Sequence, residues 1–298
     1  MQTQLPFTGT YTAIVTPFAK GGKLDEAALE KLVRSQIEGG VDGIVPVGTT
    51  GESPTLTYEE HVHVIQRAVE LAAGKIKVLA GTGGNSTSEA AYLTKMAKKA
   101  GADASLQVAP YYNKPSQEGL FQHFRAIAAE TDLPILLYSV PSRCSVEIGI
   151  ETVKRLAEAC PTVIGIKEAG GTPDRVSQLR VALGEKFIIL CGDDSLTVPF
   201  MAVGAHGVVS VASNVIPREV SQMVSAFAHG KLEAALGLHT KFFPLFKDLF
   251  IETNPVPVKA ALAMLGLCEE EYRLPLVPLS ARNRDTLRAT LKTCGVLT

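Results

Sequence analysis

Short apolar runs rich in β-branched residues recur along this chain at intervals of roughly thirty residues. Each run is followed by a polar or glycine-rich corner and then by an amphipathic segment. The eight runs cover residues 11–16, 43–47, 77–80, 104–109, 135–140, 163–167, 187–191 and 207–211. Almost wholly apolar strands suit a parallel sheet covered by helices, and eight successive β/α units close naturally into a barrel. The pattern therefore predicts an α/β protein with a (β/α)8 TIM barrel, and an open doubly wound sheet is the competing architecture.

Helical spacing fills the segments between these runs and continues after the last of them. In residues 24–37, for example, apolar residues recur with the 3.6-residue period of a helix that buries one face. Further helical patterns cover residues 232–250, 256–265 and 281–293. We expect residues 1–230 to form the catalytic barrel and residues 231–298 to form a C-terminal helical extension packed on it. No low-complexity linker separates the two, so the extension is not expected to be an independent domain.

Charge and cysteine content exclude several classes of partner. The 298 residues carry 29 Lys and Arg against 30 Asp and Glu, and no basic block occurs, so binding to nucleic acid or to an anionic membrane is not expected. Small molecules and further copies of the chain are the expected partners. Neither a signal-peptide pattern nor a membrane-length apolar run is present. We therefore expect a cytoplasmic protein, and because the five cysteines are scattered we expect their thiols to be free.

The apolar run at residues 163–168 ends in a lysine and a glutamate, just before a glycine-containing loop. Reactive groups of (β/α)8 enzymes lie at the carboxyl ends of the strands. Enzymes make lysines nucleophilic by burial, since desolvation disfavours the charged amine and favours the neutral form that attacks carbonyl groups. Lys167 is therefore a candidate Schiff-base nucleophile, and a solvated pair with Glu168 is the alternative. Because side chains alternate along a strand, Glu168 should point away from the reacting carbon.

A loop with two hydroxyl groups follows the second predicted strand. Residues 48–53 place Thr49 and Thr50 between glycines, where threonine hydroxyls and backbone N–H groups can converge on a small carboxylate. The alternative is a structural role for this segment, in which Ser53 caps the helix that begins near residue 57.

Phenol and guanidinium groups follow the fourth and fifth strands. The fourth strand is followed by Tyr111 and Tyr112 beside prolines, and the fifth ends in Tyr138 with Arg143 on its loop. A tyrosine near a reacting carbonyl can transfer protons, and the planar guanidinium of arginine matches the two oxygens of a carboxylate. Together with Lys167, these groups favour condensation of an amine with a carbonyl compound.

Metal and phosphate chemistry lack their usual residues. His61 and His63 lie in a helical segment, where residues two apart point in different directions, so they are not expected to bind one ion. No cluster of His, Asp and Glu follows any other strand. The seventh strand ends in Asp193 and Asp194, whose carboxylates would repel phosphate where barrels commonly bind it. We therefore expect no metal site and unphosphorylated substrates.

Taken together, these loops resemble the dihydrodipicolinate synthase family, within the pyruvate-dependent class I aldolase superfamily that also contains N-acetylneuraminate lyase. The resemblance covers barrel and extension and depends most on residues 48–53, 110–119, 138–143, 165–169 and 207–215. It implies condensation of pyruvate with L-aspartate 4-semialdehyde to 4-hydroxy-tetrahydrodipicolinate, the first committed step toward diaminopimelate and lysine. It also implies a homotetramer built as a dimer of dimers, and no metal or organic cofactor.

The resemblance implies a catalytic role for four residues. Lys167 would form the Schiff base with pyruvate. Tyr138 and Thr50 would form a proton relay, completed by Tyr112 of a neighbouring subunit.

It also implies how the substrates are bound. Thr49 and Thr50 would border the pyruvate carboxylate, Val209 would line the same pocket, and Arg143 would receive the carboxylate of the semialdehyde. Arg143 disfavours the alternative functions within the superfamily, N-acetylneuraminate lyase and 2-keto-3-deoxy-sugar-acid aldolase, because those enzymes do not generally carry this arginine. A catalytically silent barrel that only binds ligands is the hypothesis from a different class.

A second site of the family binds L-lysine as a feedback inhibitor at a subunit interface. Five residues match it, namely Ser53, His61, Asn85, Glu89 and Tyr111. Glu89 would supply a negative charge for the amine of the ligand. Tyr58 and Pro54 depart from the family pattern, at positions where a histidine and a small residue are common. Inhibition by L-lysine is therefore a prediction, and an interface contact without a ligand is the alternative.

Overall fold

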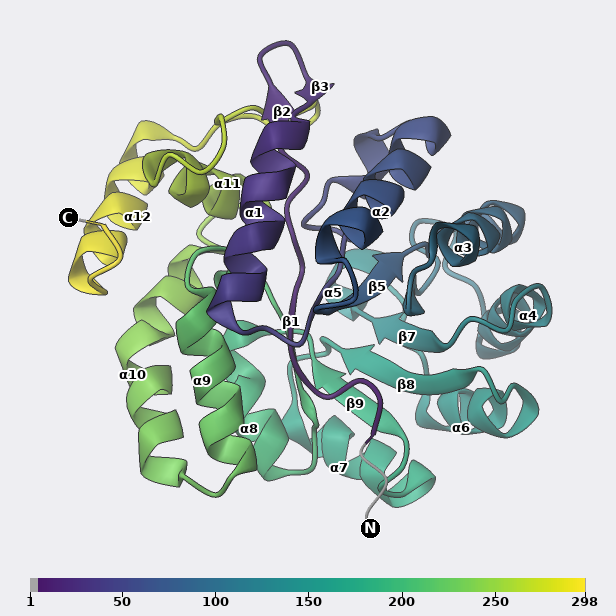
Figure 1. Ribbon diagram of the computed structural model, residues 1–298. Helices are drawn as coiled ribbons and strands as arrows, with labels where there is room; N and C mark the ends of the chain where they lie inside the picture. Colours follow the sequence, from purple (N-terminus) through teal and green to yellow (C-terminus); the bar gives the residue numbers. More distant parts are fainter. Residues whose placement is uncertain (1–4, 298) are drawn as a thin grey trace.

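Eight parallel strands close into a barrel in the computed structural model, which describes residues 5–297 (Figure 1). In chain order the strands are β1 (Gly9–Thr12), β4 (Gly43–Ile44), β5 (Lys77–Gly81), β6 (Ala104–Val108), β7 (Ile135–Ser139), β8 (Val163–Glu168), β9 (Ile188–Cys191) and β10 (Gly207–Ser210). Each pairs with the next barrel strand along the chain, and β10 closes the ring onto β1. Every predicted run overlaps one of these strands, so the predicted (β/α)8 fold is confirmed. Most runs extend slightly beyond the ladder, where the chain leaves the sheet for a loop.

Helices surround the barrel and a further group of three follows it (Figure 1). The surrounding helices are α1 (Glu26–Gly39), α2 (Tyr58–Ala72), α3 (Thr87–Ala100), α4 (Gln117–Ala129), α6 (Ile150–Ala159), α7 (Pro173–Leu183), α8 (Thr197–Ala202) and α9 (Pro217–Ala228). The loops contain α5 (Pro141–Cys144), the 3-10 helices η1 (Ser53–Thr55), η2 (Asp194–Leu196) and η3 (Ala212–Asn214), and a hairpin of β2 (Phe18–Ala19) and β3 (Lys23–Leu24). The C-terminal helices are α10 (Leu232–Asp248), α11 (Val256–Met264) and α12 (Ala281–Thr293).

Capping residues set the ends of the first two helices. The Asp25 side chain accepts a backbone hydrogen bond in the first turn of α1, and Gly40 ends that helix in the left-handed region with φ 73°. Thr57 caps α2 and forms a reciprocal capping box with Glu60. The alternative that Ser53 caps this helix is wrong, because Thr57 stands directly before the first turn and has a glutamate three residues later. Ser53 begins η1 instead.

The register between β7 and β8 brings two candidate residues side by side. Tyr138 pairs with Lys167, and Ser139 pairs with Glu168. Since side chains alternate along each strand, the first pair shares one face of the sheet and the second pair the other. Glu168 is fully buried and bonds Arg175 of α7, with its Oε2 2.8 Å from Nε of Arg175. It therefore points away from Lys167, as expected from the sequence.

The C-terminal helices pack against the end of the barrel's helical layer. α10 packs along α9, α12 packs on α10 and α11, and α11 contacts η3 near the carboxyl end of β10. Figure 1 shows this group in green and yellow beside α9 and α1. The helical extension thus packs on the barrel, while the division of the chain at residue 230 stays a prediction.

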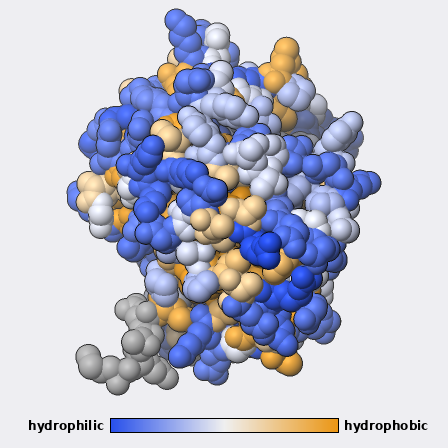
Figure 2. Space-filling view, turned by 90° about the vertical axis from the view of Figure 1, so that its right-hand side faces the viewer, coloured by the Kyte–Doolittle hydropathy of each residue, from blue (hydrophilic) through white to orange (hydrophobic). Residues whose placement is uncertain are grey.

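The outer surface of the helical layer is mostly polar. Figure 2 shows the face formed by the helices at the right of Figure 1, where hydrophilic residues predominate and apolar residues show in limited patches. Within residues 5–297, none of the helices combines the length and apolar character needed to cross a membrane. The apolar residues of the strands and of the inner helix faces form one continuous core.

Candidate active site

A cavity of about 220 Å³ opens among the loops at the carboxyl ends of the strands, and we call it the main cavity. Its lining residues are Ala13, Val45, Gly48, Thr49, Thr50, Leu106, Tyr138, Val140, Ser142, Arg143, Lys167, Ala169, Gly192, Asp193, Val211, Phe250 and Asn254. The barrel thus brings together five of the predicted site residues, Lys167, Tyr138, Thr49, Thr50 and Arg143. They come from three different strand ends, as expected for a barrel enzyme.

Lys167 lies at the base of the main cavity with its side chain almost enclosed. It is 7% exposed, and its Nζ lies 4.1 Å from the centroid of the Tyr138 ring. A Cβ atom at Gly192 would lie 2.7 Å from Cβ of Ala169 and 3.1 Å from Cε of Lys167, so a larger residue here would crowd the lysine stem. The amine therefore sits in a confined space beside a phenol, where a small carbonyl compound can meet both groups.

Thr50 is held from the C-terminal extension. Its side chain is buried at 3% exposure, and its Oγ1 accepts a hydrogen bond of 3.0 Å from Nδ2 of Asn254. Because Thr50 accepts this bond, its own hydroxyl proton remains available to another acceptor in the cavity. Asn254 lies 204 positions away in the sequence, just before α11. Sequence analysis missed it, since nothing in its local sequence distinguishes it from an ordinary loop asparagine.

Arg143 lies at the mouth of the cavity on α5. Its side chain is exposed, and its Nη2 donates to the backbone oxygen of Asn254 at 3.3 Å. An exposed guanidinium that lines the same cavity as the buried Lys167 can bind the carboxylate of a small molecule. The extension therefore contacts both Thr50 and Arg143 through one residue.

Two of the predicted catalytic and substrate-binding residues lie outside the main cavity. Val209 is buried in β10 at 1% exposure and does not contribute to the lining, where Val211, two residues later, takes its place. In the register of the barrel, Val209 pairs with Tyr11 of β1. Tyr112 is 90% exposed and has φ 74°, so its ring lies at the surface of this chain rather than in its own cavity.

The two aspartates after β9 have different environments. Asp194 is buried and accepts backbone hydrogen bonds from Val211 at 3.0 Å and from Ala212 at 2.9 Å. Burial raises the pKa of Asp194 to about 6. Asp193 lines the main cavity. The expectation that both carboxylates would act against a phosphate is therefore corrected, because Asp194 is turned into the protein and only Asp193 faces the site.

A second cavity of about 200 Å³ adjoins the first, and we call it the side cavity. It is lined by Val47, Gly48, Thr49, Ser53, Pro54, Gly81, Gly83, Leu106, Val108, Tyr111, Tyr138, Val140, Arg143 and Cys144. Ser53 and Tyr111 are thus the two predicted lysine-site residues that line it. Thr49, Tyr138 and Arg143 line both cavities, so a ligand in the side cavity would lie against residues of the main one.

The other three predicted lysine-site residues lie around the side cavity. The buried His61 is hydrogen-bonded to the backbone oxygen of Gly81 at 2.8 Å, and burial lowers the pKa of its imidazole. Asn85 donates to the backbone oxygen of Tyr111 at 3.2 Å. Burial and, after it, the charge of Glu89 raise the pKa of the phenol of Tyr111, which lines the side cavity.

His61 and His63 do not converge. While His61 faces Gly81, the Nε2 of His63 lies 2.7 Å from Oε1 of Glu26 at the surface. Within residues 5–297, no group of three or more His, Cys, Asp and Glu side chains is placed to hold a metal ion.

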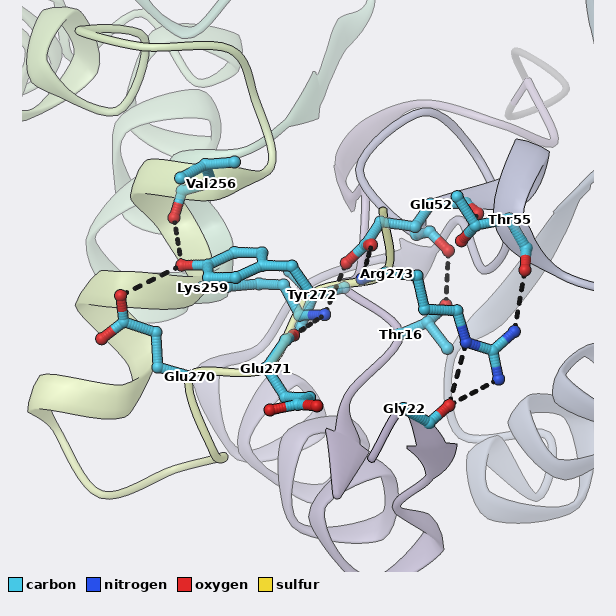
Figure 3. Close-up of polar contacts among 12 residues, drawn as sticks. Thr16, Gly22, Glu52, Thr55, Val256, Lys259, Glu270, Glu271, Tyr272 and Arg273 are labelled. Atoms are coloured by element: carbon cyan, nitrogen blue, oxygen red, sulfur yellow. Dashed lines mark hydrogen bonds and ion pairs between the residues drawn. The ribbon is translucent and has the colours of Figure 1, made fainter. Parts of the chain in front are cut away.

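A buried ion pair anchors the loop that carries Thr49 and Thr50 (Figure 3). Oε1 of Glu52 lies 2.5 Å from Nζ of Lys259 of α11, and both side chains are fully buried. Lys259 also donates to the backbone oxygen of Glu271 at 2.8 Å. Burial lowers the pKa of Lys259, and the charge of Glu52 opposes that effect. The extension thus holds this loop at Glu52 as well as at Thr50.

Arg273 continues this network toward the hairpin and α2. Its guanidinium donates to Glu60 at 2.6 Å and to the backbone oxygens of Gly22 and Thr55 at 2.7 and 2.8 Å. Figure 3 shows Arg273 and Lys259 on either side of the Glu52 loop. Sequence analysis did not identify these residues, because each ion pair joins segments far apart in the chain.

Comparison with known proteins identifies relatives of nearly the same length. The model of the dihydrodipicolinate synthetase family matches residues 6–294. A 4-hydroxy-tetrahydrodipicolinate synthase of Aquifex aeolicus is 52% identical over 286 residues, which is 96% of this chain and 97% of the relative. The solved structure of the synthase of the same name from Methylacidiphilum fumariolicum SolV has 59% identity and a TM-score of 0.96, and it covers 97% of this chain and 96% of its own.

Two further solved structures were determined with ligands. Dihydrodipicolinate synthase of Cyanidioschyzon merolae with lysine bound is 42% identical with a TM-score of 0.95, over 98% of this chain and 99% of its own. The chloride-inhibited enzyme of Acinetobacter baumannii complexed with pyruvate is 46% identical with a TM-score of 0.95, over 97% of this chain and 99% of its own.

Proposed function

Since the chain belongs to the dihydrodipicolinate synthetase family, we propose that Lys167 is the amine on which it condenses pyruvate with L-aspartate 4-semialdehyde. The activity is that of a 4-hydroxy-tetrahydrodipicolinate synthase, a lyase of the class I aldolase type. The observation that carries the mechanism is the enclosed amine of Lys167 beside the Tyr138 phenol, in a cavity with Thr50 and Arg143.

The reaction begins with attack of the Lys167 amine on the keto carbon of pyruvate, and loss of water gives an imine. Loss of a proton from the methyl carbon then gives an enamine, which attacks the aldehyde carbon of the second substrate and forms the carbon–carbon bond. The amine of that substrate next attacks the imine carbon, which closes the ring and releases Lys167. Tyr138 would move the protons of these steps, and Thr50 would relay them.

Tyr112 would complete the proton relay in a neighbouring copy of the chain. This proposal is supported by its position, because a phenol that is 90% exposed and outside its own cavity can reach another subunit. It implies an assembly in which pairs of chains share active sites, and we propose a homotetramer built as a dimer of dimers. The free state of all five cysteines supports work in the cytoplasm.

The choice of second substrate separates this activity from the sugar-acid lyases of the superfamily. A coupled assay supplies pyruvate with either L-aspartate 4-semialdehyde or N-acetylmannosamine and compares kcat/KM. We expect turnover of the semialdehyde, because Arg143 can bind its carboxylate and the cavity of about 220 Å³ suits two small molecules. Faster turnover of the sugar would assign the chain to the lyases, and turnover of neither would support a silent binding barrel.

Substitution of Arg143 by alanine should weaken use of the semialdehyde. The lost charge-assisted hydrogen bonds predict a fall in kcat/KM for this substrate of roughly 10- to 100-fold. Trapping of the pyruvate imine by borohydride should be unchanged, because Arg143 lies at the mouth rather than at Lys167. Arg155→Ala, which removes an exposed arginine of α6 paired with Glu118, is the matched control. Equal activity of Arg143→Ala and the unchanged protein would show that the carboxylate is bound elsewhere.

Lysine should inhibit the enzyme through the side cavity. The support is the position of Ser53 and Tyr111 in its lining, with the charge of Glu89 nearby. We expect activity to fall as L-lysine is raised into the millimolar range, and Glu89→Gln to shift the curve to higher lysine because a charge that attracts the ligand is lost. Activity that stays flat over the whole titration would contradict the site.

A further inference from the structure

We propose that Asp193 binds the α-ammonium group of the second substrate. The inference rests on the proposed function, in which Arg143 holds the carboxylate of L-aspartate 4-semialdehyde. That substrate carries its ammonium on the carbon next to this carboxylate. A site that recognises it therefore needs a negative group close to its arginine, facing the same space.

The charges around the main cavity meet this requirement. Among the described residues that line it, three side chains are charged, namely Lys167, Arg143 and Asp193. Lys167 is assigned to pyruvate and Arg143 to a carboxylate. Asp193 is therefore the one lining carboxylate, and the one negative partner that the lining offers to a cation.

The loop that carries Asp193 lies against the reacting lysine. Gly192, the residue before it, packs so closely that an added Cβ would lie 3.1 Å from Cε of Lys167. The backbone N–H of Gly192 also donates to the backbone oxygen of Glu168 at 2.8 Å, which fixes this loop to the end of β8. Asp193 is thus held beside the place where the imine forms and where the second substrate must arrive.

The carboxylate of Asp193 is oriented by one of its two oxygens. Oδ1 accepts hydrogen bonds from N of Ser195 at 3.0 Å and from Oγ of Ser195 at 2.9 Å. Among residues 5–297, no hydrogen bond to Oδ2 is found, so this oxygen keeps its capacity to accept from a ligand. The neighbouring Asp194 differs, because its two oxygens accept from Ser210, Val211 and Ala212. Asp194 therefore stabilises the loop through both of its oxygens, whereas Asp193 keeps one oxygen for a ligand in the cavity.

Succinate semialdehyde tests this assignment, because it differs from the substrate only in lacking the amino group. The Asp193→Asn variant keeps the oxygen that accepts from Ser195 and removes the charge. We expect its kcat/KM for aspartate semialdehyde, measured as pyruvate consumption, to fall about 10- to 100-fold, the range for a hydrogen bond to a charged group. The value for succinate semialdehyde should change less than about twofold, since no ammonium is present. Asp132→Asn, the same change at an exposed aspartate that pairs with Lys98 outside the cavity, should alter neither value.

Other outcomes separate this inference from the proposed function. An equal fall for both aldehydes, or no fall for either, overturns the role of Asp193 in binding the ammonium. Loss of borohydride-trapped pyruvate in Asp193→Asn also overturns it, because Asp193 would then serve the Lys167 amine. Failure of the unchanged protein to trap pyruvate or to consume it with aspartate semialdehyde would instead refute the proposed function.

Discussion

Replacement of Lys167 by alanine is expected to abolish imine formation and to lower kcat by at least about 10⁴-fold, as removal of a covalent nucleophile does in other enzymes. The structure leaves no substitute within the main cavity, because Lys167 is the one lysine in its lining among the described residues. The measurement is mass spectrometry after incubation with pyruvate and borohydride. The unchanged protein should gain a reduced pyruvate adduct at Lys167, and Lys167→Ala should gain none.

Lys77→Ala provides the control for non-specific reduction of lysines. Lys77 begins β5 at the opposite end of the barrel and its side chain is 52% exposed. Its loss should leave both the adduct and the activity unchanged. An adduct that maps to another lysine in the Lys167→Ala variant would show that the nucleophile has been assigned wrongly.

Replacement of Lys259 by methionine is expected to lower the free energy of unfolding by about 3 to 5 kcal/mol. Lys259→Met removes the cation but keeps most of the side-chain volume, so the fully buried carboxylate of Glu52 remains without its partner. Urea unfolding followed by circular dichroism measures the change. Because Glu52 lies two residues after Thr50, turnover should fall along with stability.

A second variant separates the unpaired charge from the loss of packing. Glu52→Gln combined with Lys259→Met removes both charges and should recover much of the lost stability, since paired removal of buried ions is often nearly neutral. Lys77→Met breaks the exposed pair with Asp103 and should change stability by less than about 1 kcal/mol. If Lys259→Met alone proved as stable as the unchanged protein, the buried pair would not be holding the loop.

Periodic patterns made the barrel predictable, and with it the position of Lys167 at the rim of the barrel. Each strand is marked by a local run, and the carboxyl end of each run marks where side chains reach the active face. Lys167, Tyr138 and Thr50 follow from these positions, because the closed ring brings all strand ends to one rim. Alternation along a strand likewise predicted that Glu168 would point away.

Long-range partners could not be predicted in the same way. The bond between Asn254 and Thr50 joins residues 204 positions apart, and no local pattern in the sequence reports which loop another will meet. The same holds for Glu52 and Lys259, whose separate sequences look like an ordinary polar loop and an ordinary helix. Even for the adjacent residues Asp193 and Asp194, the sequence does not predict which carboxylate faces the cavity, because the path of the loop decides this.

The ion pair between Lys259 and Glu52 can form only after both residues have been synthesised. The ribosome makes Glu52 long before its partner, which follows 207 positions later. Until Lys259 emerges, the carboxylate of Glu52 has no cation to accompany it into the interior and is better left in water. The loop with Thr49 and Thr50 is therefore expected to take its final place late, after all eight strands have been made. A nascent barrel can then hold Lys167 in position while it is still unable to turn over substrate.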